Sequence, residues 1–140
     1  MTRGERLFNP GNIERGATAW QGMAADQPDS RFIKFASPEF GIRALAKILL
    51  TYSKKFKQGT PQDIDTVREI INRWAPPHEN DTSAYVHHVA GVLGVGEDAV
   101  IDIADPNILE MLVRAIINHE NGRVIYSDAE IVAAIDRALA

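Results

Sequence analysis

The sequence predicts a single α+β domain over residues 1–140 that is mainly α-helical, with about five helices and one small β-hairpin. Three observations lead to this fold class. Apolar residues recur at helical spacing in five segments, each bounded by residues that start or stop helices. Two short segments nearer the N-terminus are candidate strands. A chain of 140 residues is long enough to bury one core of its own.

The N-terminal quarter is expected to hold turns and the hairpin. Residues 1–16 read as an irregular segment, because the Asn-Pro-Gly sequence at residues 9–11 is a turn signal. Residues 20–22 and 31–35 are the candidate strands, and the long connection between them contains a proline and two aspartates. We therefore expect a hairpin with a long loop.

Three helices are expected in the middle of the chain, each with apolar residues at helical spacing on one side. A serine before a proline starts the first, a proline starts the second, and an aspartate followed by a threonine starts the third. Prolines stop the second helix, and a glycine stops the third. These helices run from Pro38 to Tyr52, from Pro61 to Trp74, and from Asp81 or Thr82 to Gly94.

Two more helices are expected in the last third of the chain. Residues 106–122 come after an aspartate cap, begin with a first-turn proline and end at a glycine. Ser127 and Glu130 form a capping box for a final helix that reaches Ala140. With the hairpin, these elements complete the predicted domain.

Glu120 is an acidic residue on the apolar face of the 106–122 helix. Leucine, valine and isoleucine recur on this face at i, i+3, i+4, i+7 and i+8, and the glutamate continues the stripe at the helix end. Desolvation disfavours a charged carboxylate there, and the carbonyl oxygens of the last turn repel it. Both effects raise its pKa, as a general acid near neutral pH requires. The alternative is a glutamate that turns to solvent or pairs with Arg114 or Arg123.

Residues 115–122, AIINHENG, resemble the helix end that carries the catalytic glutamate in lysozyme-like lytic transglycosylases and related glucosaminidases. Residues 9–13, NPGNI, together with 32–35 and 37–45, resemble the segment C-terminal to that glutamate in glucosaminidase-type members of the superfamily. Here this part precedes the glutamate, so the resemblance suggests a circular permutation. The two chain termini should then lie within a loop's length of each other.

As a whole, the chain also resembles small lysozyme-like proteins encoded by bacteriophages. These proteins open with Asn-Pro-Gly-Asn-Ile and finish with His-Glu-Asn-Gly. Between these motifs they carry a Trp-Ala-Pro-Pro-x-Glu-Asn-x-Thr-x-x-Tyr segment, which matches residues 74–85. Members of the group are described as virion-associated or structural proteins. The resemblance therefore implies a lysozyme-like fold and a place in a phage particle.

The resemblance further implies a lytic transglycosylase that cuts peptidoglycan glycan strands between N-acetylmuramic acid and N-acetylglucosamine. Glu120 would be the catalytic acid and base, and Glu14 a second catalytic carboxylate. No cofactor enters this reaction. The residues expected to bind the sugars are Asn9, Asn12, Trp20, Glu79, Asn80 and Tyr85.

Other interpretations stay open. A muramidase or glucosaminidase would hydrolyse the glycan, with Glu14 activating water. A non-catalytic virion protein would instead bind other virion subunits or recognise the glycan. Glu14 is equally explained as a surface glutamate paired with Arg6 or Arg15, and Trp20 as a tryptophan that closes a small core.

Composition and motifs argue against several further classes. No stretch approaches the ~20 apolar residues of a membrane span, and the N-terminus has no apolar signal core. We therefore expect synthesis in the host cytoplasm and delivery to the periplasmic cell wall by the virion, with other virion proteins as partners. The four histidines lack metal-ligand spacing, so no metal site is expected. A net charge of −4 argues against binding to duplex nucleic acid.

Overall fold

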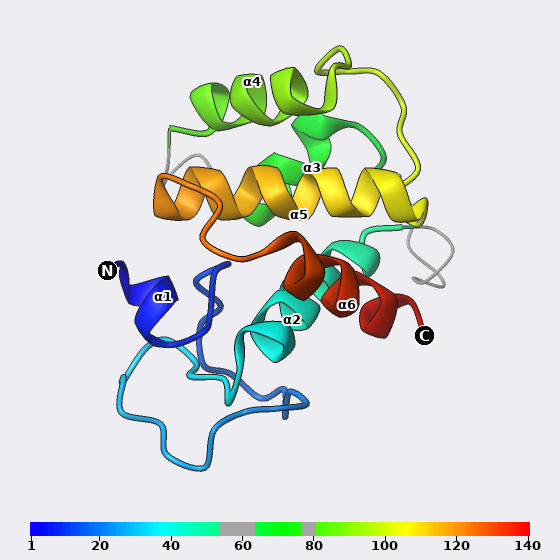
Figure 1. Ribbon diagram of the computed structural model, residues 1–140. Helices are drawn as coiled ribbons and strands as arrows, with labels where there is room; N and C mark the ends of the chain where they lie inside the picture. The colour runs from blue at the N-terminus through cyan, green and yellow to red at the C-terminus, as the bar shows by residue number, and fades with distance from the viewer. Residues whose placement is uncertain (54–63, 77–80) are drawn as a thin grey trace.

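The computed structural model of the chain describes residues 1–53, 64–76 and 81–140. These residues form six α-helices joined by turns and extended segments (Figure 1). In this described part, no helix combines the length and the apolar character that a bilayer crossing requires. The helices are α1 (Arg3–Arg6), α2 (Pro38–Leu50), α3 (Val67–Trp74), α4 (Thr82–Leu93), α5 (Pro106–Asn121) and α6 (Asp128–Leu139).

The main core is organised around α5. This helix lies between α4 on one side and α2 with α6 on the other, while α3 packs against α4 (Figure 1). Leu109, Leu112, Val113 and Ile116 of α5 are all fully buried in the main core. Burial of each such side chain contributes roughly 1.5–3 kcal/mol. The apolar stripe of α5 therefore holds the other helices together.

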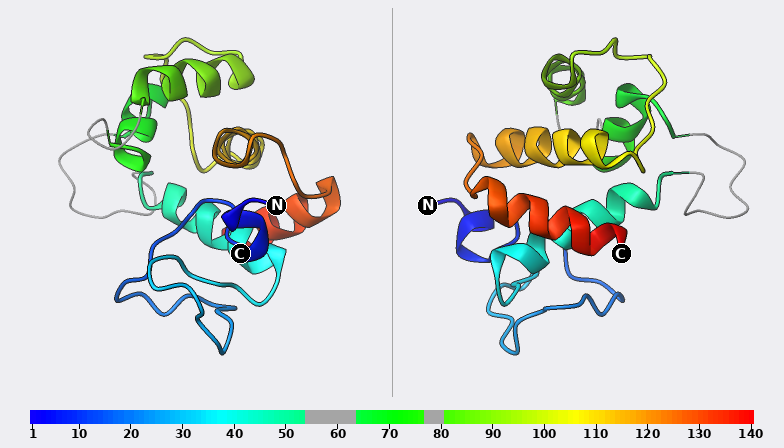
Figure 2. Two further views of the ribbon diagram at one scale, coloured as in Figure 1. Left: turned by 90° about the vertical axis from the view of Figure 1, so that its left-hand side faces the viewer. Right: turned by 45° about the vertical axis from the view of Figure 1, so that its right-hand side comes forward.

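A second, smaller core joins the N-terminal segment to α2. Its buried members are Ile13, Ile33, Phe35 and Ala44, and Trp20 packs against them. Figure 2 shows residues 1–36 as a looped layer that covers one side of α2. This layer brings the Asn-Pro-Gly-Asn segment to the body of the helices.

No β-strand occurs in the described residues, so the predicted α+β class with a β-hairpin, and the lysozyme-like fold inferred with it, is wrong. The structure is all-helical. Residues 31–36 are hydrogen-bonded through their backbone, but their partners are successively residues 13–15, Leu7 and residues 22–24. Each segment supplies one or two bonds, which leaves only isolated β-bridges such as Glu14 with Phe32.

Side chains replace the missing strand partners around this extended segment. The Gln27 amide donates to the carbonyl oxygen of Lys34 at 2.8 Å and accepts from its N–H at 2.9 Å. The Asp29 carboxylate accepts hydrogen bonds from the N–H groups of Arg31 and Phe32, each at 2.8 Å. Local side-chain bonds of this kind compete with a regular ladder. They explain why the predicted hairpin does not form.

Four of the predicted helix starts are confirmed, whereas α2 ends at Leu50, earlier than the predicted Tyr52. α2 begins at Pro38, α4 at Thr82, α5 at Pro106 and α6 directly after Ser127. Pro61, the predicted start of the helix that corresponds to α3, lies outside the described residues. Residues 64–66 are not helical, so α3 begins later than expected.

Two helix starts are set by capping boxes that periodicity alone misses. Thr66 and Glu69 form such a box at the start of α3. Thr2 and Glu5 form another around α1, which is a single turn. One turn is too short to show apolar periodicity, which is why the sequence predicts an irregular N-terminal segment.

The chain termini do not meet the expectation for a circular permutation. Thr2 is hydrogen-bonded to Asn121, so the N-terminus lies near the C-terminal end of α5. The C-terminus lies at the far end of α6, which has 12 residues and is roughly 18 Å long. Figure 1 and the right-hand view of Figure 2 show the termini at opposite ends of the helical layers. The predicted adjacency is therefore wrong.

The packing of the N-terminal layer on α2 depends on Gly41. A Cβ atom at this position would collide with the backbone carbonyl of Phe8, whereas a Cβ at Gly91 on α4 would meet nothing. We expect Gly41→Ala to destabilise the protein by about 2 kcal/mol, because a backbone contact cannot yield. Gly91→Ala should instead stabilise it by roughly 0.5–1 kcal/mol through helix propensity. Urea unfolding of the two variants tests this, and equal stability of both would contradict the proposed packing.

Candidate active site

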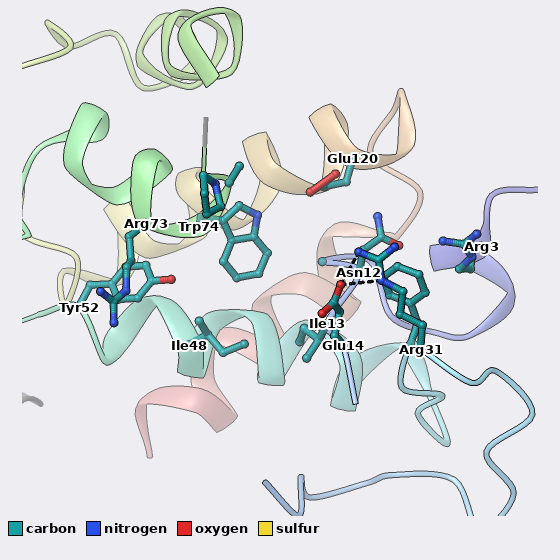
Figure 3. A pocket seen from close by; sticks show the side chains of 14 residues that line it. Arg3, Asn12, Ile13, Glu14, Arg31, Ile48, Tyr52, Arg73, Trp74 and Glu120 are labelled. Carbon is teal, nitrogen blue, oxygen red and sulfur yellow. Dashed lines mark hydrogen bonds and ion pairs between the residues drawn. The ribbon is translucent and has the colours of Figure 1, made fainter. Parts of the chain in front are cut away.

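An open groove of about 490 Å³ lies between the N-terminal layer and the helices (Figure 3). Its walls come from four parts of the chain. α5 supplies Glu120, and α2 with the residues after it supplies Ile48 and Tyr52. The end of α3 and the residues directly after it supply 73–76. The N-terminal layer supplies Arg3, residues 11–14, Arg31 and Phe32.

Glu120 stands in the wall of this groove, one residue before the end of α5. It is half-buried. Burial raises the pKa of its carboxyl group, while hydrogen bonds from the side chains of Trp74 and Asn12 act in the opposite direction. Figure 3 shows these three side chains facing the same part of the groove. The carboxyl group therefore holds a proton more readily than an exposed glutamate. When it is ionised, the side chains of Trp74 and Asn12 stabilise the carboxylate.

Asn121 fixes the end of α5 against the N-terminal layer. Its side-chain amide donates to the carbonyl oxygens of Pro10 at 3.0 Å and Ile117 at 2.9 Å, and its oxygen accepts from Thr2 Oγ1 at 2.8 Å. Gly4 permits the approach, because a Cβ there would lie 2.7 Å from the Asn121 oxygen. This connection places the Asn-Pro-Gly-Asn segment beside Glu120.

The two predicted asparagines have different surroundings. Asn9 is only 1% exposed, and its amide bonds to the backbone of Ile13 and Ile33. It shapes the turn and does not line the groove. Asn12 has a φ of 51°, in the left-handed region that asparagine tolerates better than most residues, and its side chain reaches Glu120. Of these two asparagines, only Asn12 lines the groove.

Glu14 shares the groove with Glu120 but is held by a cation. Its Oε1 atom accepts from Nε of Arg31 at 2.7 Å and lies 2.6 Å from Nη2 of the same residue. This pair differs from the expected partners, which were Arg6 and Arg15. The side chains of this pair are 64% and 55% exposed, so Glu14 forms a surface ion pair, whereas Glu120 is half-buried.

Trp74 and Tyr85 are aromatic residues close to Glu120. Trp74 lines the groove. The sequence shows it only as part of a helical stripe and as the first residue of the 74–85 segment, and does not predict it as a site residue. Tyr85 is 1% exposed and stacks on His119, with ring centroids 3.7 Å apart. Burial raises the pKa of its hydroxyl group, the nearby Glu120 carboxylate adds to this, and Trp74 lowers it. Among the described residues none makes a well-aligned hydrogen bond to that hydroxyl.

The remaining predicted residues are Trp20, Glu79 and Asn80. Trp20 packs on the second core and is absent from the groove wall. Glu79 and Asn80 lie outside the described residues. Three arginines that line the groove were not predicted, namely Arg3, Arg31 and Arg73. No sequence pattern predicts that these arginines line one groove, because they lie in three separate segments of the chain.

The described residues contain no group of three or more potential metal ligands. His88 and His119 do approach each other, with their Nδ1 atoms 3.0 Å apart. Two nitrogens at this distance share one proton, so a hydrogen bond accounts for the contact. The chemistry of the groove therefore rests on carboxyl, amide, indole and guanidinium groups.

The donors around Glu120 give a first test of this geometry. Trp74→Phe removes the indole N–H and keeps an aromatic ring, so the pKa of Glu120 should rise further above that of a free glutamate. Asn12→Gly removes the other donor, tolerates the positive φ and should act in the same direction. Trp20→Phe, on the second core, is the matched control and should leave the pKa unchanged. Carbon-detected NMR titration of the Glu120 carboxyl group measures the shifts, and a fall in either groove variant contradicts the geometry.

The burial of Glu120 also predicts how stability depends on pH. A carboxyl group whose pKa is raised by folding stays protonated in the folded state over a window that opens above its ordinary value of 4.5. As pH rises through that window, the folded protein must ionise a buried group and loses stability. Glu120→Gln should therefore be more stable than the wild type at about pH 7.5, and this difference should vanish near pH 3.5. Thermal melts across this range test the prediction, and a gap that grows towards acid would contradict it.

Comparison with known proteins gives an informative relative. No protein-family model matches the chain. Protein P5 of Pseudoalteromonas phage PM2 is 35% identical to it over 132 residues, which cover 92% of this chain and 77% of that protein. The expected likeness to a phage protein is thus confirmed, whereas a lysozyme-like family is not shown. The chain belongs to the family of Protein P5 of Pseudoalteromonas phage PM2.

Proposed function

We propose that the protein is a virion-associated enzyme that cleaves the glycan strands of bacterial peptidoglycan by the lytic transglycosylase route. The position of Glu120 carries the proposal. It is a half-buried carboxyl group in the wall of an open groove; burial raises its pKa, and the nearby side chains of Trp74 and Asn12 act in the opposite direction. A groove of about 490 Å³ falls in the size range of ligand sites.

The proposed reaction uses Glu120 twice. Its carboxylic acid donates a proton to the oxygen of the bond between N-acetylmuramic acid and N-acetylglucosamine, and the bond from the muramoyl C1 to that oxygen breaks. The N-acetylglucosamine fragment leaves with the proton as a hydroxyl group. The Glu120 carboxylate then takes the proton of the muramoyl 6-hydroxyl group while O6 attacks C1. A 1,6-anhydro ring forms, and the acid is regenerated without water.

The surroundings of Glu120 suit both halves of this cycle. Burial favours the acid form that the first half needs. Once the proton has left, the N–H groups of Trp74 and Asn12 stabilise the carboxylate that the second half needs. A carboxyl group that must act first as an acid and then as a base needs a pKa between these two influences, and burial and hydrogen-bond donors supply them.

The state of Glu14 favours the transglycosylase route over hydrolysis. A hydrolase requires a second carboxylate to activate water or attack the sugar. Here Glu14 is bonded to Arg31 through two nitrogens. A muramidase or glucosaminidase reaction would first have to break this ion pair. The transglycosylase route needs no second carboxylate, because the substrate supplies the nucleophile.

A second candidate is a non-catalytic protein of the phage particle that binds other virion proteins or wall glycan. The comparison favours this candidate more directly, since the relative is a phage protein whose name states no reaction. The engaged Glu14 is also consistent with it. The two candidates differ in a single observable, namely whether glycan bonds are cut.

Purified, outer-membrane-stripped peptidoglycan distinguishes the candidates. We expect the wild type to release muropeptides with 1,6-anhydro ends, and Glu120→Gln to lower the rate by at least about 100-fold, as for the loss of a general acid. Glu14→Gln should retain most of the activity. Glu110→Gln is the matched control, because it changes a glutamate on α5 that pairs with Arg114 away from the groove. Mass spectrometry of the soluble products provides the readout.

Three outcomes of this experiment are informative. Reducing ends in place of anhydro ends, with activity lost in Glu14→Gln, would replace the transglycosylase by a hydrolase. Equal activity of wild type and Glu120→Gln would remove Glu120 from the mechanism. A folded wild type that releases nothing from Gram-negative or Gram-positive walls would leave the non-catalytic candidate.

A further inference from the structure

We infer that the groove binds a glycan carrying carboxylate groups, which it engages through Arg73 at one end and Arg3 at the other. This inference rests on the proposed function, because it specifies the substrate class of the same groove. Figure 3 shows the two arginines at opposite ends, with Glu120 between them. A substrate that passes Glu120 therefore meets a guanidinium group on each side.

The charge of the groove wall differs from that of the whole protein. Among the described residues, three arginines and two glutamates line it, which gives these side chains a formal charge of +1 if both glutamates are ionised. The complete chain, by contrast, carries a net charge of −4. When Glu120 holds its proton, the groove charge rises to +2. A cationic groove on an acidic protein favours an anionic ligand over a neutral one.

The end formed by the N-terminal layer holds Arg3 in place for such a contact. Its guanidinium carbon lies 4.5 Å from the centroid of the Phe32 ring, and the side chain is 49% exposed. The Asp29 carboxylate is 4.0 Å away, at the upper limit of an ion pair. Arg31, on the same ring at 5.0 Å, is committed to Glu14. Stacking fixes a guanidinium plane and lowers the entropy lost on binding, so Arg3 is the available cation at this end.

The other end is formed by Arg73 and Tyr52. Arg73 is exposed at the C-terminal end of α3, one residue before Trp74. Its charge lowers the pKa of the Tyr52 hydroxyl, although burial outweighs this effect and raises that pKa to about 12. The hydroxyl therefore stays protonated at neutral pH and remains able to donate. A carboxylate at this end would find a guanidinium group with a neutral donor beside it.

Carboxylates in a peptidoglycan strand have two sources. The lactyl group of N-acetylmuramic acid supplies one when it carries no peptide, and the peptide stems supply others. Oligomers of N-acetylglucosamine have the same β-1,4 backbone and no carboxylate. Comparing N-acetylglucosamine oligomers with peptidoglycan strands therefore separates recognition of charge from recognition of the sugar backbone. Comparing peptide-free strands with stem-bearing strands separates the two sources of the carboxylate.

Binding to the full-length Glu120→Gln variant tests the inference without turnover. The probes are chitohexaose, glycan strands freed of peptide by an amidase, and stem-bearing strands, each titrated by calorimetry. We expect at least one carboxylate-bearing probe to bind roughly tenfold more tightly than chitohexaose at low salt and to lose this advantage in about 0.5 M salt. Arg3→Gln and Arg73→Gln should each weaken it by about three- to tenfold.

Arg68→Gln is the matched control, since Arg68 lies on the same helix as Arg73, pairs with Asp98 and is absent from the groove wall. It should leave binding unchanged, and circular dichroism should show all variants folded. Preference for stem-bearing strands assigns the contacts to peptide carboxylates, preference for the amidase-treated strands assigns them to the lactyl group, and equal binding of both shows that the groove accepts either carboxylate. Equal affinity for chitohexaose, or no effect of either groove arginine, overturns the inference. Failure of the proposed function shows separately, as a wild type that binds these strands and releases no products.

Discussion

The buried side chain of Asn121 connects the two parts of the chain that make the groove. It joins the last turn of α5 to the carbonyl oxygen of Pro10 and to the hydroxyl group of Thr2. These contacts span more than a hundred residues of sequence, and an amide is well suited to them because it donates and accepts at once. Without this connection Asn12 would have no fixed position relative to Glu120. The environment of the acid therefore depends on a neighbour that does not itself line the groove.

Glu120 is subject to two opposing effects. Burial against the end of α3 disfavours its charge, while the indole N–H of Trp74 and the amide of Asn12 favour it. A carboxyl group in apolar surroundings alone would resist giving up its proton, and one with donors alone would resist holding it. The combination is what acid and base roles in one cycle require. Glu14, by contrast, is an exposed residue that forms an ion pair with Arg31.

The N-terminal layer shows how a groove wall forms without a β-sheet. Its extended segment, residues 31–36, takes partners from several turns, and the side chains of Gln27 and Asp29 satisfy the remaining backbone groups. Arg3 and Arg31 approach the ring of Phe32, which is 8% exposed. The guanidinium groups of Arg3 and Arg31 are thereby held in the groove wall by a layer that consists mostly of turns.

The sequence by itself determined four of the helices, α2, α4, α5 and α6, and the place of Glu120 at the end of an apolar stripe. Caps and stops around α2, α4, α5 and α6 are local signals, and an apolar stripe that ends on Glu120 is visible from spacing alone. Tertiary structure decided the rest. The 31–35 segment forms no hairpin because distant turns and nearby side chains compete for its backbone. Asn9 is buried while Asn12 faces the groove, although both belong to one motif. Arg3, Arg31 and Arg73 come together only through long-range packing, and no local pattern encodes contacts between segments that far apart.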